Sequence, residues 1–558
     1  TETTMESHNK EQWNVIVMSD GGKPIFWRFG KEEEILTICG VIQALRASAS
    51  ASALGDLQSL RSKERSIVFM IAGSITLVAI SKQGNAEEVQ LLMKLRLEYL
   101  YGQIIFGMTH QVQTVLAQNP SYDLGEALQA SETLMCAMLD DSGAEGGVGP
   151  FLTGAVEVLG PIAGDVRDKA SAALFEVAQK IPDTVFAILL LGEKLVSLVQ
   201  PSYLPHQLRP SDLKLLNKFV NGQARLLTSE LWSPVCLPRF NSSGFLYCYS
   251  TYLHEETKLT LVLVSQLNTT DQFELFRRGS TEIRKELSLP VPVDSVLKIA
   301  EHSEAAPSGS LSNNDVAWKR LNEPSNGSGN TIPVADEENV PDVLTNDDAY
   351  NPLQQGDEDS SRRSSLLSEV YEATDPEKLA ATIERYLKLG DVLHFMFRRD
   401  VEVKTHSSKE CGLLPQCFSP PLDFPFVDAC SKQRVWAMYQ KLCLRMRLGA
   451  ATTTATWTRL DGDDSDSQAV DEEELSSNIE SKSLSAAMAL VESVPVTNGM
   501  TYFVDGAEMF LAMNGNGFEL YAIFPASVPV TEATSSCAKL ARRLVAESGK
   551  LLLTTPLT

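Results

Sequence analysis

Cysteine and histidine, the residue types that bind zinc, come closest together in a single stretch of the chain. His406, Cys411, Cys417 and Cys430 lie within it. Structural zinc sites use closely paired ligands, such as Cys-x-x-Cys followed by a second pair, because each pair reaches one ion from one turn. These four residues show no such pairing, and no HExxH sequence occurs in the chain. The sequence therefore predicts no metal site.

Motifs for nucleotide binding and nucleophilic catalysis are also missing. The chain contains neither the GxxxxGK[ST] loop that cradles phosphates nor the GxSxG elbow that presents a serine. Gly515 and Gly517 are too few for a dinucleotide fingerprint and are better explained by a turn. His394 stands in an apolar run, which favours a core histidine. We therefore predict no catalytic residues and no cofactor, and a hydrolase or transferase is the least favoured hypothesis.

Negative charge is concentrated in two stretches of low complexity. The 558-residue chain carries a formal net charge of −24, of which residues 303–375 contribute −11 and residues 460–476 contribute −8. An acidic chain disfavours nucleic acid as the main partner. Both stretches contain too few apolar residues to offset the entropy that folding removes, which predicts acidic, disordered inserts. Residues 362–365, RRSS, resemble a site for a basophilic kinase, with a chance match as the alternative.

The nine cysteines indicate the compartment. Their number is odd, no Cys-x-x-Cys pair occurs, and several stand in apolar runs. This predicts reduced thiols in the cytosol rather than a disulfide framework. No run of 18 apolar residues is present, and the first residues, TETTMESHNKEQ, are polar. We therefore expect neither a transmembrane helix nor a secretory signal, and any membrane association is expected to be peripheral.

The elements that must position functional side chains begin with a hairpin and a helix. Two apolar runs, 13–18 and 25–29, flank Asp20-Gly21-Gly22, a turn of the kind that joins antiparallel strands. Apolar residues then recur at steps of three or four: Ile35, Ile38, Ile42 and Leu45. This spacing predicts a helix that buries these four side chains. A second hairpin, 67–81, and a helical stretch, 87–116, complete the first module.

The same order of hairpin, helix, hairpin and helix is indicated again in a second module, and a third α+β module follows it, beginning with a mostly helical segment. In the second module, strand-like and helical segments occupy residues 183–191, 194–199, 210–221, 245–252, 259–264 and 270–289. In the third, they occupy residues 377–398, 435–448, 500–504, 509–513, 518–524 and 531–553. The arrangement predicts an α+β fold in which helices flank antiparallel sheets, in the manner of longin or roadblock domains.

The predicted boundaries follow from these elements and from the changes in composition. Residues 1–11 are assigned to a polar tail. The domains are assigned to residues 12–165, 166–300 and 377–558, and the acidic inserts to residues 301–376 and 450–485.

Seven stretches in these modules resemble one protein family. They are DGGKPIFWRFG (20–30), CGVIQALRA (39–47), RSIVFMIAGSITLVAIS (65–81), EYLYGQI (98–104), RPSDLKLL (209–216), WSPVCLPRFNSSGFLY (232–247) and GFELYAIFP (517–525). By these residues the chain resembles the monensin-sensitivity-one, or Mon-one, family of vacuolar fusion proteins. The most specific stretch is the one that begins at Trp232, and the two inserts match poorly.

The resemblance implies an architecture and an activity. It implies three longin domains and a second three-longin subunit of the Ccz-one type as an obligate partner. The pair is expected to act as a guanine-nucleotide exchange factor for the late-endosomal and vacuolar Rab GTPase of the Rab-seven type. It is expected to be cytoplasmic and recruited peripherally to late-endosomal or vacuolar membranes by an early-endosomal Rab and phosphoinositides. The alternative is a longin scaffold or tether that binds Rab GTPases without exchanging their nucleotide.

The resemblance also implies where the GTPase binds. In the family, the first longin domains of both subunits pair and present a joint surface to the Rab. This expectation is carried onto the 20–30 hairpin and the 36–47 helix as a region, with candidate residues Lys23, Trp27, Thr37, Gly40, Gln43 and Ala44. Gly40 and Ala44 are small enough for another backbone to approach closely, and ordinary small surface residues are the alternative.

Two further sites are considered for recruitment. Trp232 is interpreted either as a core residue of the second module or as an exposed anchor for the recruiting Rab, with Arg239 close by. Phosphoinositide binding would need a basic patch, for which the pairs Arg277-Arg278 and Arg398-Arg399 are candidates. Solvated surface charge is the alternative interpretation of both pairs.

Overall fold

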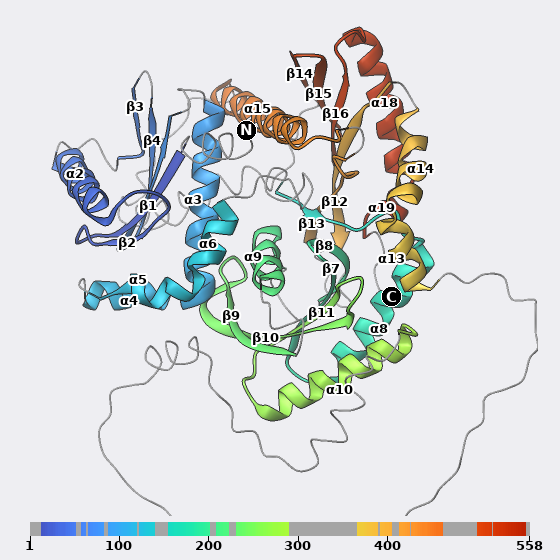
Figure 1. Ribbon diagram of the computed structural model, residues 1–558, viewed down its shortest axis with the longest axis horizontal. Helices are drawn as coiled ribbons and strands as arrows, with labels where there is room; N and C mark the ends of the chain where they lie inside the picture. The colour runs from blue at the N-terminus through green and yellow to red at the C-terminus, as the bar shows by residue number, and fades with distance from the viewer. Residues whose placement is uncertain are drawn as a thin grey trace, which may run out of the picture. The chain divides into compact units, whose positions relative to one another are not determined.

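The computed structural model describes most of the three predicted modules. The described residues are 13–51, 57–62, 65–82, 87–119, 122–139, 154–200, 208–222, 230–289, 365–388, 391–403, 412–423, 426–460, 499–515 and 517–553. The predicted polar tail, the greater part of the first acidic insert and residues 461–485 of the second lie outside these ranges. Figure 1 draws the first domain in blue to cyan, the second in green and the third in yellow to red.

The first domain has the predicted hairpin, helix, hairpin and helix. Its elements are β1 (Trp13–Ser19), β2 (Pro24–Trp27), α2 (Glu32–Ala51), β3 (Ser59–Arg61), β4 (Ser66–Ala72), β5 (Ile75–Ser81), α3 (Glu87–Met108), α4 (Gln111–Gln118), α5 (Leu124–Leu128), the 3-10 turn η1 (Gln129–Ser131) and α6 (Glu132–Leu139). The sheet is antiparallel in the order β2-β1-β5-β4-β3. The helical stretch predicted over 87–116 is divided, because Thr109 takes a left-handed backbone conformation with a φ of 58°.

The second domain repeats this topology. Its elements are α8 (Gly164–Lys180), β7 (Thr184–Leu191), β8 (Lys194–Val199), α9 (Pro210–Asn221), β9 (Leu231–Leu237), β10 (Asn241–His254), β11 (Leu259–Ser265) and α10 (Thr270–Glu286). The strand order β8-β7-β11-β10-β9 is the counterpart of that in the first sheet. All residues of β7 and β11 are buried, because helices cover both faces of this sheet.

The third domain has the same topology again. Its elements are α14 (Pro376–Leu387), β12 (His394–Val403), β13 (Gly412–Phe418), α15 (Ala429–Leu460), β14 (Met500–Asp505), β15 (Glu508–Gly515), β16 (Phe518–Pro525), α18 (Val530–Ala546) and α19 (Ser548–Leu551). The sheet runs β14-β15-β16-β12-β13-β6. The three helices that follow the first hairpin of each domain, α2, α9 and α15, are therefore topological counterparts.

One strand joins the second and third sheets. Strand β6 (Val156–Glu157) pairs in parallel with β13, where Val156 lies opposite Gln416. The next residue, Val158, forms a parallel bridge to Leu195 in β8, and the Leu159 N–H donates to the Leu195 carbonyl over 2.9 Å. Four consecutive residues thus cover the edge of one sheet and then the edge of the next, and the second and third domains share backbone hydrogen bonds.

Helix α3 connects the first domain to the other two. It packs on β4 and β5 of its own sheet and also on α9, α15 and β9 (Figure 1). Leu95, Leu97, Leu100 and Ile104 are all fully buried, although these positions point to different sides of a helix. A helix that is apolar on all sides needs cover on all sides, and α3 finds it between the three domains.

The structure corrects three details of the sequence analysis. Leu45 is 40% exposed rather than buried, since it lies about 80° around the helix from Ile35, and Cys39 is buried beside Ile35 and Ile42 instead. Residues 366–374, assigned to the disordered insert, form helix α13 (Leu366–Thr374), which buries Leu366, Val370 and Ala373 against the second domain. Helix α15 extends to residue 460, so the second insert does not begin at residue 450.

Candidate partner-binding surface

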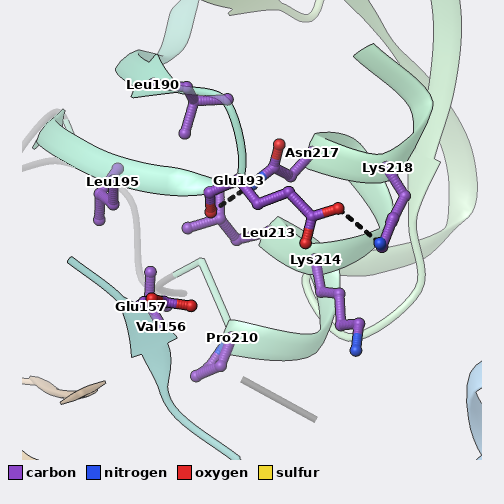
Figure 2. Close-up of a pocket in the computed structure, with 10 residues that line it drawn as sticks. All are labelled: Val156, Glu157, Leu190, Glu193, Leu195, Pro210, Leu213, Lys214, Asn217 and Lys218. Atoms are coloured by element: carbon purple, nitrogen blue, oxygen red, sulfur yellow. Dashed lines mark hydrogen bonds and ion pairs between the residues drawn. The ribbon is translucent and has the colours of Figure 1, made fainter. Parts of the chain in front are cut away.

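A small cavity in the second domain is too small for a substrate. It lies between β6, β8 and α9 and has a volume of about 20 Å³, which is room for about one water molecule. Figure 2 shows its charged lining, in which the Glu193 carboxylate turns to the Lys218 ammonium. The buried Glu157 carboxylate lies 3.3 Å from Lys194 Nζ. These contacts hold β6 against β8 and α9, so the cavity has a structural explanation.

The residues with catalytic chemistry are used for packing. Both ring nitrogens of His394 are bonded, with Nδ1 2.8 Å from the Tyr439 hydroxyl and Nε2 2.9 Å from the Pro420 carbonyl oxygen. Burial lowers the pKa of His394 to about 4, so the ring is neutral near pH 7, as predicted for a core histidine. In the described part of the chain, no three His, Cys, Asp or Glu side chains converge as metal ligands would.

Arg398 belongs to a buried charge network and not to a lipid-binding patch. Its side chain is fully buried, with Nη1 3.3 Å from Glu519 Oε1, and the other Glu519 oxygen accepts a 2.6 Å bond from Arg447 of α15. The neighbouring Arg399 donates to the Ser548 hydroxyl. The Arg398-Arg399 patch considered above is therefore ruled out, since a buried, paired guanidinium has no access to phosphate. Arg277 and Arg278 are exposed on α10, where Arg277 pairs with Glu274.

Helix α2 is positioned by its first turn and by its buried side. Glu32, Glu33 and Glu34 stand in the first turn, where the helix dipole favours negative charge. Ile35, Cys39 and Ile42 recur at helical spacing and pack on the first sheet, and burial raises the pKa of the Cys39 thiol. The helix therefore has a fixed orientation on the sheet, and that orientation determines which residues face outward.

The outward side of α2 is apolar and uncharged. Leu36, Val41 and Leu45 are 49%, 55% and 40% exposed, and Gly40 and Ala44 are exposed between them. Residues 35–45, ILTICGVIQAL, contain no charged residue. Gly40 has open space where a Cβ would stand. At 100° per residue, the small side chains form the middle of this face, and the leucines and the valine flank it.

The counterparts of α2 show what normally covers such a face. In α9, residues 210–217 are all buried, and α3 and α6 pack on the helix from the first domain. In α15, Val435, Trp436 and Tyr439 are buried, and α3 packs on it as well. No element of the described residues covers Leu36, Val41 or Leu45 in a comparable way. The exposed face of α2 is therefore the part of this topology that lacks its cover, which marks it as a candidate interface.

Two predicted site residues on α2 have local bonds. The Thr37 hydroxyl donates to the Glu33 carbonyl one turn earlier, over 3.0 Å. Gln43 Nε2 donates to the Asp20 carbonyl in the turn of the first hairpin, over 3.0 Å. Gly22, with a φ of 80°, passes so close that a Cβ there would lie 2.5 Å from Gln43 Oε1. Gln43 thus fixes the turn to the helix, and Thr37 remains on the exposed face.

Lys23 and Trp27 do not lie on the apolar face of α2. Lys23 Nζ pairs with the Asp123 carboxylate over 2.8 Å, which holds the pKa of Asp123 below its usual value. Asp123 also caps α5 by accepting from the Glu126 N–H. Trp27, at the end of β2, is half-buried against the first core. The structure therefore groups Thr37, Gly40 and Ala44 and separates Lys23 and Trp27 from them.

The sequence analysis missed Leu36 and Leu45 as members of the candidate surface. The usable signal was the absence of charge along residues 35–45, since a helix with one face in water ordinarily has polar residues on that face.

Trp232 stands on β9, the edge strand of the second sheet. Its ring stacks on Tyr247 at 5.9 Å and packs edge-on against Phe273 at 6.0 Å, and its Nε1 donates to Asn268 over 3.2 Å. The side chain is half-exposed, which leaves both sequence interpretations open. The nearby Arg239 backbone N–H donates to both Asp212 carboxylate oxygens at 3.1 Å.

Comparison with family models covers all three domains. The models for the first, second and third longin domains of FUZ, MON1 and HPS1 match residues 13–138, 182–277 and 391–548. Together these matches cover more than half of the chain. The chain belongs to the MON1 family of longin proteins. The predicted fold of three longin domains, each an antiparallel sheet with flanking helices, is confirmed.

Individual MON1 relatives are similar over part of the chain. "Vacuolar fusion protein MON1 homolog A" of Gallus gallus is 34% identical over 276 residues, 49% of this chain and 47% of the relative. The human protein of the same name is 33% identical over 293 residues, 51% of this chain and 42% of the relative. "Vacuolar fusion protein MON1" of Yarrowia lipolytica is 29% identical over 259 residues, 46% of each chain. The matching region thus spans about half the length of these curated MON1 proteins.

The MON1 longin domains contain no membrane-spanning element in the described residues. None of their helices combines the length and the hydropathy needed to cross a bilayer. The longest helix, α15, carries lysine and arginine along its length.

Proposed function

We propose that this MON1-family chain is one subunit of a guanine-nucleotide exchange factor for a late-endosomal or vacuolar Rab GTPase of the Rab-seven type. Its partner in the proposal is a three-longin subunit of the Ccz-one type, and its cellular role is endosome maturation and fusion with the vacuole or lysosome. The observation that carries the proposal is the uncovered apolar face of α2, formed by Leu36, Gly40, Val41, Ala44 and Leu45. Support also comes from the relatives, which are named for vacuolar fusion.

The proposed mechanism is differential binding. An exchange factor accelerates nucleotide release when it binds the nucleotide-free GTPase more tightly than the loaded form, because it holds a switch loop in a position that disfavours Mg²⁺ and phosphate. Thermodynamic linkage then lowers the affinity for nucleotide by the same factor. Such a mechanism needs shaped apolar surface and no acid, base or nucleophile. The α2 face offers such a surface, with small residues in the middle where a partner backbone can approach.

The test is nucleotide release from the Rab, measured with a fluorescent GDP analogue. The purified chain and its partner subunit should accelerate release well above the rate of the Rab alone, and either subunit alone should have little effect. If the wild-type pair does not accelerate release, the exchange proposal is wrong. Tight binding of the GTP-loaded Rab without any release would instead identify the chain as a tether.

A matched pair of variants tests the α2 face separately. Leu45 and Leu267 are both 40% exposed, and Leu267 lies in the loop after β11, far along the chain from α2. Leu45→Lys should reduce exchange about tenfold or more, as expected when an apolar interface residue is charged, and Leu267→Lys should not. Ala44→Arg should act in the same direction as Leu45→Lys. If the pair exchanges nucleotide and none of these variants changes the rate, the site lies elsewhere on the exchange factor.

Recruitment is proposed to use the second domain. Trp232 is half-exposed on an edge strand, which suits an anchor for the early-endosomal Rab. Arg277 and Arg278 are the exposed basic pair that remains for phosphoinositides. Trp232→Ala should reduce binding to the recruiting Rab on liposomes while exchange in solution is retained, and unchanged liposome recruitment would remove Trp232 from the proposal.

A further inference from the structure

Apart from α2, one other element of the described residues gathers exposed apolar side chains. The described residues include nine large apolar side chains that are markedly exposed, of which three belong to α2 and three to β14. On β14, Met500, Tyr502 and Val504 are 46%, 47% and 55% exposed. They stand at alternate positions and therefore share one face of the strand. Among the described strands, β14 pairs only with β15 and is therefore the edge of the third sheet.

The β14 edge is held firmly at both ends. The Asn514 N–H donates to the Gly499 carbonyl over 3.0 Å, just before the strand begins. At the other end, Arg434 of α15 bonds the Asp505 carboxylate at 2.9 Å and the Glu508 carboxylate at 2.6 Å. Six consecutive residues are thus extended and ordered, with the outward-pointing N–H and C=O groups of alternate residues at the sheet edge. A rigid edge of this kind loses little conformational entropy when another strand pairs with it.

The counterpart of β14 in the second domain shows why the β14 face is exposed. There the edge strand β9 is covered on one face by α10, whose Phe273 packs against Trp232, and α3 packs against the same strand. In the third domain, α18 follows the sheet in the place of α10, but the fourth residue of α18 is Ala533, followed by Thr534, where the fourth residue of α10 is Phe273. The contact of Thr534 with Met500 is a single weak bond of 3.4 Å to the sulfur. Because α18 offers small side chains here, the apolar face of β14 stays open.

The opposite face of β14 has two basic side chains of α15 beside its middle residue, while Asp505 at its end is paired with Arg434. Phe503 points to this side and stacks on Phe510 with ring centroids 5.3 Å apart. Lys441 Nζ and the Arg445 guanidinium, both from α15, lie 5.2 Å and 5.1 Å from the Phe503 ring centroid. The strand thus has an open apolar face on one side and two cationic groups on the other.

We propose that β14 is a docking edge for an extended segment of a partner protein in which apolar and acidic residues alternate. The segment adds to the third sheet as a further strand, through main-chain hydrogen bonds. Its apolar side chains extend the face of Met500, Tyr502 and Val504, and its carboxylates face Lys441 and Arg445. An open strand edge binds another extended strand through main-chain hydrogen bonds. The basic residues of α15 favour acidic over basic side chains on the face of that strand that lies beside Phe503. The inference is independent of the proposed exchange activity and concerns a different domain.

The test uses three synthetic peptides as probes. They are an eight-residue peptide of alternating valine and glutamate, the same peptide with lysine in place of glutamate, and the acidic peptide with every backbone amide N-methylated, so that neither of its edges can donate. Binding to the full chain is measured by fluorescence anisotropy. We expect the acidic peptide to bind about tenfold more tightly than the basic one, and the methylated peptide to lose binding because it cannot pair as a strand.

Variants of the chain locate the binding. Tyr502→Lys should reduce the affinity for the acidic peptide about tenfold, since it places charge in the apolar face. Tyr371→Lys is the matched control, because Tyr371 is 43% exposed on α13, and it should bind like the wild type. Lys441→Glu should reverse the preference between the acidic and basic peptides. A substitution at such exposed positions leaves the core intact, which an unchanged melting temperature will confirm.

Several outcomes would overturn the inference. Equal binding of acidic and basic peptides, or an equal affinity of Tyr502→Lys and Tyr371→Lys, would show that β14 is not the docking edge. A concentration-dependent dimer that Val504→Lys abolishes would assign the edge to a second copy of the chain. Slow hydrogen exchange in the isolated monomer at the β14 amides that point away from β15 would assign the edge to another segment of the same chain. Fast exchange that the acidic peptide slows is the expected result.

Discussion

Helices α2 and α9 stand at the same point of the same topology and differ in what covers them. Each follows the first hairpin of its domain and packs on one face of its sheet. Helix α9 is covered on its other side by α3 and α6, and its side chains are buried from residue 210 to residue 217. Helix α2 exposes Leu36, Val41 and Leu45.

The difference teaches that the longin topology does not decide where the interface is. Each of the three domains has a helix that is apolar on more than one side. Which of these helices remains exposed depends on whether other elements of the chain pack on its outer side. In α9 and α15 the cover comes from within the chain. In α2 no described residue gives comparable cover, which is why the proposed GTPase and partner contacts belong to the first domain.

The largest loss of stability that distinguishes α2 from its counterparts is expected for a substitution in α15. Arg447→Ala removes one partner of the buried Glu519 carboxylate, and breaking a buried ion pair costs about 3–5 kcal/mol. Arg46 of α2 is the matched site, since it bonds Asp20 and Thr76 near the surface, and Arg46→Ala should cost about 1 kcal/mol or less. Differential scanning calorimetry measures both. Equal shifts in melting temperature would mean that α2 is as deeply integrated as its counterpart.

Two leucine-to-alanine substitutions test directly whether other elements cover α9 but not α2. Leu216 of α9 is fully buried, and Leu36 of α2 is 49% exposed. Leu216→Ala should destabilise the chain by about 2–5 kcal/mol, because it removes buried apolar volume and leaves a cavity. Leu36→Ala should change stability by about 0.5 kcal/mol or less. Guanidinium unfolding monitored by tryptophan fluorescence compares them, and a large loss for Leu36→Ala would show that something in the chain covers α2.

A smaller effect is a pH dependence of the stability that originates from His394 in the third domain. His394 has its pKa lowered to about 4 by burial, whereas an unfolded histidine titrates near 6.5. Between these values the unfolded state binds more protons, so stability is complete above about pH 6.5 and falls toward pH 4, by at most about 1.4 kcal/mol per pH unit. Melting temperatures of the wild type and of His394→Gln between pH 4 and 7 separate this contribution. If both chains lose stability equally, His394 is not its source.

The smallest effect concerns the turn beside α2. Gln43→Ala removes the bond to the Asp20 carbonyl, which is exposed to water, so stability should fall by about 0.5–1 kcal/mol. If Gln43 only fixes the turn, exchange should fall by no more than about twofold. A tenfold loss of exchange with unchanged melting would instead make Gln43 a direct contact with the GTPase.

The fold was predictable because its determinants are local. The hairpin turns at residues 20–22 and 505–506 and the apolar runs on either side of them indicate strands without any reference to distant residues. The repeated order of elements then suggests repeated domains. Helix α13 was missed because nine residues next to an acidic stretch look too polar to fold alone. Leu366, Val370 and Ala373 become a core face only against the second domain.

The candidate site was predictable in part. The small residues Gly40 and Ala44 were singled out from their size and their place on the helix, and the structure shows that they are exposed. The orientation of Leu45 was wrong, because the sequence does not tell how wide the buried stripe of a helix is. Arg398 stands next to Arg399 and was therefore considered part of an exposed basic pair, but its side chain is buried. Its partners Glu519 and Arg447 lie far away along the chain and cannot be matched from spacing.

Strand β6 and the two residues after it, which connect the third sheet to the second, have a consequence for how the chain folds. Val156 pairs with Gln416, about 260 residues later, so β6 is synthesised long before its partner strand exists. Until then, its edge and the apolar side of the second domain stay available for wrong pairings, which is a known hazard of contacts that are distant in sequence. Once β13 arrives, the two domains complete one another and are expected to unfold together. A nascent chain that stops before residue 412 should therefore need chaperone protection that the full chain does not.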